Sequence, residues 1–282
     1  MSDGMDATRK LIYDIGMHRG EDTEFYLSRG HRVVGVEANP TLVAGLRAKF
    51  ASEIASGQLQ LVDKAIAATA GHVQFAINDQ FSIWGSISET FIERNAGFGT
   101  SSRYVQVESV PMDAVLQQYG VPYYMKIDIE GMDILAVKAL HSVAQRPKYL
   151  SIESAVTSPN TGIKEAFDEL AHLWVLGYRQ FKYVDQVGLQ TLKAQLSVEG
   201  TPVTWQYRQE SSGPFGEESP GRWLSIGATL ARMAMLSAYW HTIGQGRYSK
   251  TLPSKIGRKL YGLVNRGSHS WFDLHAKLGG TV

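Results

Sequence analysis

The chain has 282 residues, of which 44% are hydrophobic and 20% are charged, and its formal net charge is +1. This balance predicts a soluble globular protein and excludes disordered and collagen-like chains. The absence of cysteine excludes disulfides, zinc–thiolate sites, iron–sulfur clusters and thiol nucleophiles. No apolar run is long enough to span a membrane and residues 1–9 are too polar for a signal peptide, so we expect a cytoplasmic protein.

The first 150 residues alternate apolar runs with amphipathic segments, which is typical of βαβ units around a mostly parallel sheet. We therefore predict an α/β fold with helices on both faces of this sheet. Gly30 and the Asn39-Pro40 pair mark element ends because these residues favour turns. The expected strands are 11–14, 33–37, 58–65, 122–128, 149–153 and 178–184, and the expected helices are 21–29, 41–56, 131–140 and 163–176.

Two segments interrupt this alternation. Residues 72–77 and 104–110 alternate or are β-branched, and we expect them to form an inserted β-hairpin around a loop rich in Gly, Ser and Asn. Residues 188–222 are rich in turn-forming residues and predict a long surface loop. A helix is expected after this loop, at 224–240.

The C-terminal part of the chain is basic. Residues 219–282 contain nine Lys and Arg side chains and one acid, Asp273, whereas the part before them is acidic. We expect one domain over 1–187, with 188–282 forming a long loop and a basic extension that pack on the same domain. The extension either docks on the acidic body or contacts an anionic partner or a membrane surface.

Five acidic residues fall at or beside the carboxyl ends of predicted strands: Asp14, Glu37, Asp63, Asp128 and Glu153. In an open parallel sheet this edge binds ligands. Five acids there favour a ligand rich in hydroxyl and amino groups. Each acid taken alone is equally well explained as a helix cap or a turn former.

A glycine-containing turn, Asp14-x-Gly16-x-x-x-Gly20, separates the first strand from a helix. Glycine has no Cβ, so a ligand can approach this backbone closely. Glu37 ends the next strand 23 residues after Asp14, where a carboxylate can accept both hydroxyls of an adenosine ribose. A nicotinamide dehydrogenase would instead carry G-x-G-x-x-G, and the acids at the start of this helix would repel its pyrophosphate. A cofactor without phosphates, such as S-adenosylmethionine, fits better.

Three segments resemble the FkbM family of S-adenosylmethionine-dependent methyltransferases: residues 14–23, residues 33–40 and, most specifically, Lys126-Ile-Asp-Ile-Glu-Gly131. The resemblance runs from about Leu11 to Asp185. It implies a class I, Rossmann-like methyltransferase fold and O-methylation of hydroxyls on sugars and natural products. Many members carry Ala-Asn after the first glycine where this chain has Met17-His18, so we expect His18 to replace that Asn or to face the substrate.

The resemblance also implies a cofactor site within residues 1–187. Asp14, Gly16 and Gly20 are expected around the methionine portion of S-adenosylmethionine, and Glu37 is expected to hold its ribose. Further residues expected to contact the cofactor are Asn39, Asp63, Lys64, Ala65, Ser86 and Asp128.

Methyl transfer to a hydroxyl needs alignment and a general base. Asp128 is the first candidate and Glu130 the second, with Glu153 and His18 also expected in reach of the same edge. Side chains alternate along an extended chain, so Asp128 and Glu130 share a side, where Lys126 can pair with one of them. Alternatively, these three motif residues form a structural network that caps the next helix. Two carboxylates could bind Mg²⁺, but the motif predicts no metal, and the histidines show no metal-ligand spacing.

The leading hypothesis is an S-adenosylmethionine-dependent O-methyltransferase that acts on a hydroxyl of a sugar, glycolipid, polysaccharide or natural product. One alternative is a nicotinamide-dependent oxidoreductase, which the glycine spacing disfavours. Another is a non-catalytic module that binds an anionic partner through the basic extension. The chain lacks the interleaved aromatic and basic residues of a nucleic-acid module, so no nucleic-acid partner is expected. Loop aromatics such as Trp84, Trp205 and Phe215 either stack on a sugar face or pack in the core.

Overall fold

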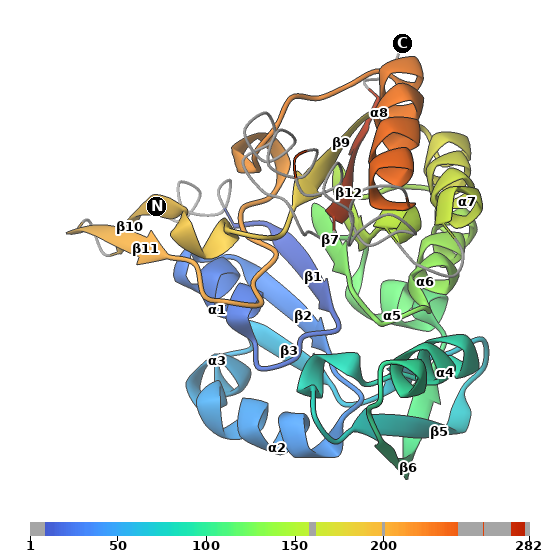
Figure 1. Cartoon of the computed structure of the whole chain (residues 1–282). Helices are drawn as coiled ribbons and strands as arrows, with labels where there is room; N and C mark the ends of the chain where they lie inside the picture. The colour runs from blue at the N-terminus through green and yellow to red at the C-terminus, as the bar shows by residue number, and fades with distance from the viewer. Residues whose placement is uncertain (1–8, 158–161, 199–200, 242–255, 257–271, 280–282) are drawn as a thin grey trace.

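The computed structural model describes residues 9–157, 162–198, 201–241, 256 and 272–279. Its centre is a seven-stranded sheet in the order β3-β2-β1-β7-β8-β12-β9 (Figure 1). The strands from β3 to β8 in this order are parallel, and β12 is antiparallel to both of its neighbours. The strands are β1 (Leu11–Ile15), β2 (Arg32–Val36), β3 (Leu59–Val62), β7 (Tyr124–Ile127), β8 (Tyr149–Glu153), β9 (Tyr178–Asp185) and β12 (Phe272–Leu278).

The predicted α/β fold with a mostly parallel sheet is confirmed. Strands such as β2 and β7 are nearly continuous apolar runs because helices or loops cover both of their faces. On one face, Leu170, Met233 and Met125 belong to a single large core cluster. The helices that contribute to this cluster are α5 (Met112–Tyr119), α6 (Asp133–Ala139), α7 (Gly162–Val175) and α8 (Ile226–Tyr239), of which α8 matches the helix expected at 224–240.

The opposite face is covered by α1 (Glu21–Ser28), α2 (Pro40–Lys49) and the segment 205–223. Phe215 of this segment stacks on Tyr124 of β7, with ring centroids 4.3 Å apart and 8° between the planes. Its Tyr207 packs against Phe25 of α1, with centroids 4.9 Å apart. These aromatic rings supply the apolar area that a helix would otherwise bury against the sheet.

The prediction of a long surface loop at 188–222 is therefore wrong. Its first half forms a hairpin of β10 (Lys193–Val198) and β11 (Thr201–Gln206), which extends away from the main sheet (Figure 1). Its second half packs on the sheet because its aromatic residues are separated by turn residues that let the chain follow the surface. The composition of this segment indicates turns, but only the three-dimensional packing shows what its aromatic rings contact.

The inserted hairpin is present as a separate small sheet, in which β5 (Gly71–Asn78) pairs antiparallel with β6 (Ser102–Val110) and β4 (Ala65–Ile66) lies parallel to β6. The connection from β5 to β6 is not only a loop as predicted. It contains the helix α4 (Glu89–Gly97), which places Arg94 beside the sheet edge described below.

Two predicted elements are divided. The helix expected at 41–56 is split into α2 and α3 (Ala51–Ala55) at Phe50. The strand expected at 58–65 ends at Val62, and Ala65 begins β4 of the small sheet. Short 3₁₀ helices cover Ser82–Trp84, Leu140–Ser142, Ala155–Thr157, Leu189–Thr191 and Gly216–Glu218.

The C-terminal extension contributes β12, which lies between β8 and β9 and was not predicted. The basic stretches 242–255 and 257–271, on which a contact with an anionic partner or membrane surface was expected, lie outside the described residues, as do residues 1–8. No helix in the described part of the chain is long and apolar enough to cross a membrane.

Candidate functional site

A tight turn follows β1 at the carboxyl edge of the sheet. Gly16 has a φ of +85°, and a Cβ on it would overlap the carbonyl oxygen of Asp128. A Cβ on Gly20 would lie 2.5 Å from the Phe50 ring. Both missing side chains make room for protein atoms, so close packing of the chain requires these glycines. The expected approach of a cofactor to this backbone stays a prediction.

A buried charge network lies next to this turn. The Lys126 ammonium on β7 is 3.3 Å from a carboxylate oxygen of Asp14, 3.3 Å from one of Asp22 and 3.7 Å from one of Asp128. The Thr23 hydroxyl donates to Asp14 at 2.7 Å. Burial raises the pKa of Asp14 to about 6, although Lys126 opposes this shift. The Asp14 side chain is completely buried and holds the turn in place. Its expected contact with a cofactor stays a prediction.

Glu37 follows β2 with its carboxylate fixed by the backbone. One oxygen accepts the His18 N–H and the other accepts the Asn39 N–H, each at 2.8 Å. Burial raises the pKa of Glu37 to about 7, against the effect of these donors. A carboxylate has about four acceptor positions, so positions remain for further donors. A rigid carboxylate of this kind fits the two hydroxyls of a ribose, which is the role the resemblance implies.

Two other residues expected to contact the cofactor are buried with structural partners. Asn39 caps α2 by accepting the Thr41 N–H at 3.1 Å. The Ser86 hydroxyl donates to the Glu130 carbonyl oxygen at 2.7 Å, and only 1% of the residue is exposed. Ser86 therefore positions the backbone of Glu130. The predicted contact between Ser86 and a cofactor stays a prediction.

The residues after β3 form surface ion pairs. Asp63 pairs with Arg47 at 2.7 Å and Lys64 pairs with Glu108 at 2.7 Å, and Ala65 is buried in β4. These contacts account for the side chains of Asp63 and Lys64 without a ligand. A contact between this segment and adenine stays a prediction.

Three predicted catalytic acids meet at the carboxyl edge of the sheet. One carboxylate oxygen each of Asp128, Glu130 and Glu153 lies within 4.8 Å of the others, and Arg94 lies 3.5 Å from Glu130. Burial raises the pKa of Glu153 to about 8 and the pKa of Glu130 well above its usual value, and neighbouring carboxylates add to both shifts. Glu130 and Glu153 therefore retain protons near neutral pH, and the two titrate together. Such a group can bind hydroxyls and accept a proton from one.

Asp273 belongs to the same edge and was not predicted as a site residue. It lies opposite Glu153 in the antiparallel pairing of β12 with β8. Burial raises the pKa of Asp273 well above its usual value, and the charges of Asp128 and Glu153 raise it further. The available signal was a single acid within a basic C-terminal segment. Asp273 reaches the edge of the sheet only because β12 inserts beside β8.

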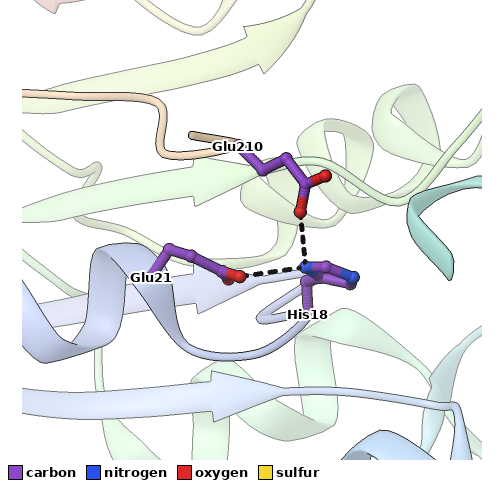
Figure 2. Close-up of side chains that lie close together, drawn as sticks. All are labelled: His18, Glu21 and Glu210. Carbon is purple, nitrogen blue, oxygen red and sulfur yellow. Dashed lines mark ion pairs between the residues drawn. The ribbon is translucent and has the colours of Figure 1, made fainter. Parts of the chain in front are cut away.

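His18 occupies a second cluster of titratable side chains rather than joining the three acids. Its Nδ1 is 3.4 Å from Oε1 of Glu21 and 3.7 Å from Oε2 of Glu210 (Figure 2). Its Nε2 is 2.9 Å from the Ser82 hydroxyl oxygen. Glu210 comes from the segment that covers the sheet, so this cluster joins the turn after β1 to a distant part of the chain. The proposed roles of His18 as a replacement for Asn or as a substrate contact stay predictions.

A buried acid behind the three-carboxylate cluster makes stability depend on pH. Glu169 of α7 accepts the Ser154 hydroxyl and the Ala155 N–H, each at 2.9 Å, and burial raises its pKa from 4.5 to about 8. Between these values the unfolded chain releases a proton that the folded chain keeps, so stability falls as pH rises. We expect Glu169→Gln to reduce this fall by up to about 1.4 kcal/mol per pH unit.

Urea unfolding at intervals from pH 5 to pH 8 measures this effect. Glu93→Gln, which changes an exposed acid on α4, is the control and should leave the slope unchanged. Equal slopes in wild type and Glu169→Gln would show that Glu169 does not keep its proton in the folded state.

Comparison with known proteins identifies the family of this chain. A sequence model described as the methyltransferase FkbM domain matches residues 14–180, which is more than half of the chain. The chain belongs to the FkbM methyltransferase family. Membership of this family favours methyltransferase activity, with S-adenosylmethionine as the methyl donor. The resemblance predicted from the sequence is confirmed.

Other similarities to this FkbM chain are short or distant. A probable ribosomal RNA small subunit methyltransferase A from Methanospirillum hungatei is 42% identical over 62 residues, which cover 22% of this chain and 24% of that protein. A precorrin-6y C5,15-methyltransferase from Geobacter metallireducens is 12% identical over 70% of this chain and 73% of that one, with a TM-score of 0.35. An SAH-bound methyltransferase from Podospora anserina is 11% identical over 72% and 74%, with a TM-score of 0.36. The matched part spans about a quarter of the curated relative.

Proposed function

We propose that this protein transfers a methyl group to a hydroxyl of a sugar, glycolipid, polysaccharide or natural product. The observation that carries the proposal is the cluster of Asp128, Glu130 and Glu153 at the carboxyl edge of the sheet. Carboxylates accept hydrogen bonds from hydroxyls, and carboxyls that retain protons donate to hydroxyl oxygens. An acceptor with neighbouring hydroxyls can therefore use both protonation states of this cluster.

Glu37 is the residue proposed to hold the cofactor, by accepting the ribose hydroxyls. The backbone N–H groups of His18 and Asn39 fix its carboxylate before the ligand arrives, which reduces the entropy lost on binding. When bound, S-adenosylmethionine supplies a methyl group on a positively charged sulfonium. The acidic edge of the sheet favours that positive charge.

Asp128 is the proposed general base. Its side chain is 40% exposed, compared with 12% for Glu130, so Asp128 is the more accessible of these two acids. Lys126, 3.7 Å away, restrains it from the buried side. The acceptor hydroxyl gives its proton to Asp128 while its oxygen gains the methyl group. Glu130, held beside Arg94, and Glu153 orient the other hydroxyls of the acceptor.

Calorimetric titration with S-adenosylhomocysteine, beside NAD and NADP, tests the cofactor assignment. We expect micromolar binding of S-adenosylhomocysteine and none of the nicotinamide cofactors. Glu37→Ala should weaken this binding about 100-fold, because each hydrogen bond to a charged group contributes about 1.5–3 kcal/mol. Glu53→Ala, which removes a partly exposed acid on α3, is the control. Binding of NAD alone would instead support the oxidoreductase hypothesis.

Transfer of a labelled methyl group to a panel of hydroxylated acceptors tests the reaction. With an acceptor that is methylated, Asp128→Asn should keep its affinity for S-adenosylhomocysteine and lose about 100-fold or more in turnover, as expected when a general base is removed. Methylation of amines or of RNA, with no hydroxylated small molecule accepted, would overturn the proposed acceptor class but leave the cofactor assignment intact.

A further inference from the structure

The cluster of His18, Glu21 and Glu210 brings together, from two distant segments, three side chains of types that can bind metal ions. His18 follows β1, Glu21 begins α1, and Glu210 lies in the segment that covers the sheet. Figure 2 shows both carboxylates pointing toward the same edge of the imidazole ring. The three ligand atoms lie within 4.8 Å of one another.

The separations within this cluster fit metal ligands better than hydrogen bonds. The Nδ1 atom of His18 is 3.4 Å from Glu21 and 3.7 Å from Glu210, whereas N–H···O hydrogen bonds measure about 2.7–3.2 Å. Ligands of a tetrahedral zinc ion, with bonds of about 2.0–2.2 Å, lie about 3.3–3.6 Å apart. The Nδ1 atom is also buried and has no hydrogen-bond partner among the residues that the structure describes. A buried polar atom of this kind costs free energy unless something binds it.

Neighbouring groups orient His18 and Glu21. The Nε2 atom of His18 meets the Ser82 hydroxyl at 2.9 Å, and a proton on Nε2 leaves the lone pair of Nδ1 directed between the two carboxylates. The other oxygen of Glu21 accepts the Arg19 N–H at 3.1 Å, which leaves Oε1 facing His18. The Arg19 guanidinium contacts Ser82, on the Nε2 side of the ring. Metal-binding histidines commonly have such an outer hydrogen bond.

The cluster of Asp128, Glu130 and Glu153 at the sheet edge is a poorer candidate for a metal site, because cationic side chains lie beside it. Lys126 lies 3.7 Å from Asp128 and Arg94 lies 3.5 Å from Glu130, so cations of the protein itself already stand against two of its carboxylates. A metal ion there would be repelled by both. Among the described residues, Glu21 and Glu210 form ion pairs with His18 and with no Lys or Arg side chain.

We infer that His18, Glu21 and Glu210 form a binding site for a divalent transition-metal ion of the zinc class. One imidazole nitrogen and two carboxylate oxygens are common ligands of this ion, and the fourth position stays open for water or for an oxygen of a ligand. The ion joins the turn after β1 to the segment that carries Glu210. The site is independent of the acceptor proposed above, because it uses none of the three acids at the sheet edge.

Zinc titration of the full-length protein, without a histidine tag and after treatment with a chelator, tests the inference. We expect one equivalent of Zn²⁺ to bind and to raise the melting temperature. Glu210→Gln and His18→Gln should each weaken binding at least about 100-fold, and Ser82→Ala about tenfold or more because it removes the outer hydrogen bond. Glu218→Gln, in the same segment but paired with Arg29, is the matched control and should bind as wild type does.

Three outcomes would overturn the inference. Absence of binding to wild type would leave these residues as an ion-pair cluster only. Equal affinity in wild type and Glu210→Gln would place the ion elsewhere. Loss of binding in Glu153→Gln, with Glu210→Gln unaffected, would assign the ion to the three-acid cluster. Each result is read from binding and melting temperature, so it does not depend on knowledge of the methyl acceptor.

Discussion

Gly16→Ala is expected to destabilise the protein by more than about 4 kcal/mol, or to prevent it from folding. The new Cβ would overlap the carbonyl oxygen of Asp128, and the φ of +85° is itself unfavourable for alanine. The carbonyl cannot easily move, because the Asp128 N–H donates to Ile15 at 2.8 Å and holds the end of β7 against β1. Urea unfolding of the purified variant, together with its soluble yield, measures the loss.

Gly57→Ala separates steric overlap from backbone strain. Gly57 has a similar φ of +75°, but the nearest atom to a Cβ there is the Gln60 amide nitrogen at 3.9 Å. We expect a loss of about 1–2 kcal/mol, from the left-handed conformation alone. Similar losses in both variants would mean that contact with Asp128 is not the reason for glycine at position 16.

Lys126→Met is expected to cost about 3–5 kcal/mol, because it leaves buried carboxylates without their cation. Lys126 is 4% exposed and stands 3.3 Å from both Asp14 and Asp22, neither of which reaches solvent to any extent. Methionine fills a similar volume, so the loss of stability comes from the missing charge rather than from a cavity. Urea unfolding at pH 7 measures it.

The loss of stability in Lys126→Met should depend on pH. Without the ammonium, the folded-state pKa of Asp14 rises above its present value of about 6, so Asp14 holds a proton that the unfolded chain has released. The deficit should therefore be smaller at pH 5 than at pH 8. Lys64→Met, which breaks an exposed ion pair with Glu108, is the control and should change stability little at either pH. A deficit independent of pH would show that packing, not charge, is lost.

The sequence was sufficient for the parallel part of the fold because that part follows from local patterns. Apolar runs and turn residues predicted β1, β2, β7 and β8 close to where they are found. Since parallel strands end at one edge, the same patterns predicted that Asp128 and Glu153 would lie together, and their carboxylates do. The family followed from the motif around Lys126 and is confirmed.

The local environment of each site residue was not predictable in the same way. Asp14 and Ser86 occur in positions typical of ligand contacts, yet both are buried with protein partners. The helix α4, which supplies Arg94, lies in a segment whose composition indicated only a loop. Whether a polar side chain faces a ligand or the protein depends on neighbours that are remote in the chain, and periodicity carries no information about them.

The sequence by itself therefore determined the fold class, the family and the acidic edge of the sheet, because strand ends and glycine turns are encoded within a few residues. The tertiary structure decided that β12 inserts between β8 and β9 and brings Asp273 opposite Glu153. It also decided that Glu210 meets His18 and Glu21. These contacts join segments far apart in the chain, and the burial of apolar surface by Phe215 and Phe272, rather than any local pattern, holds them together.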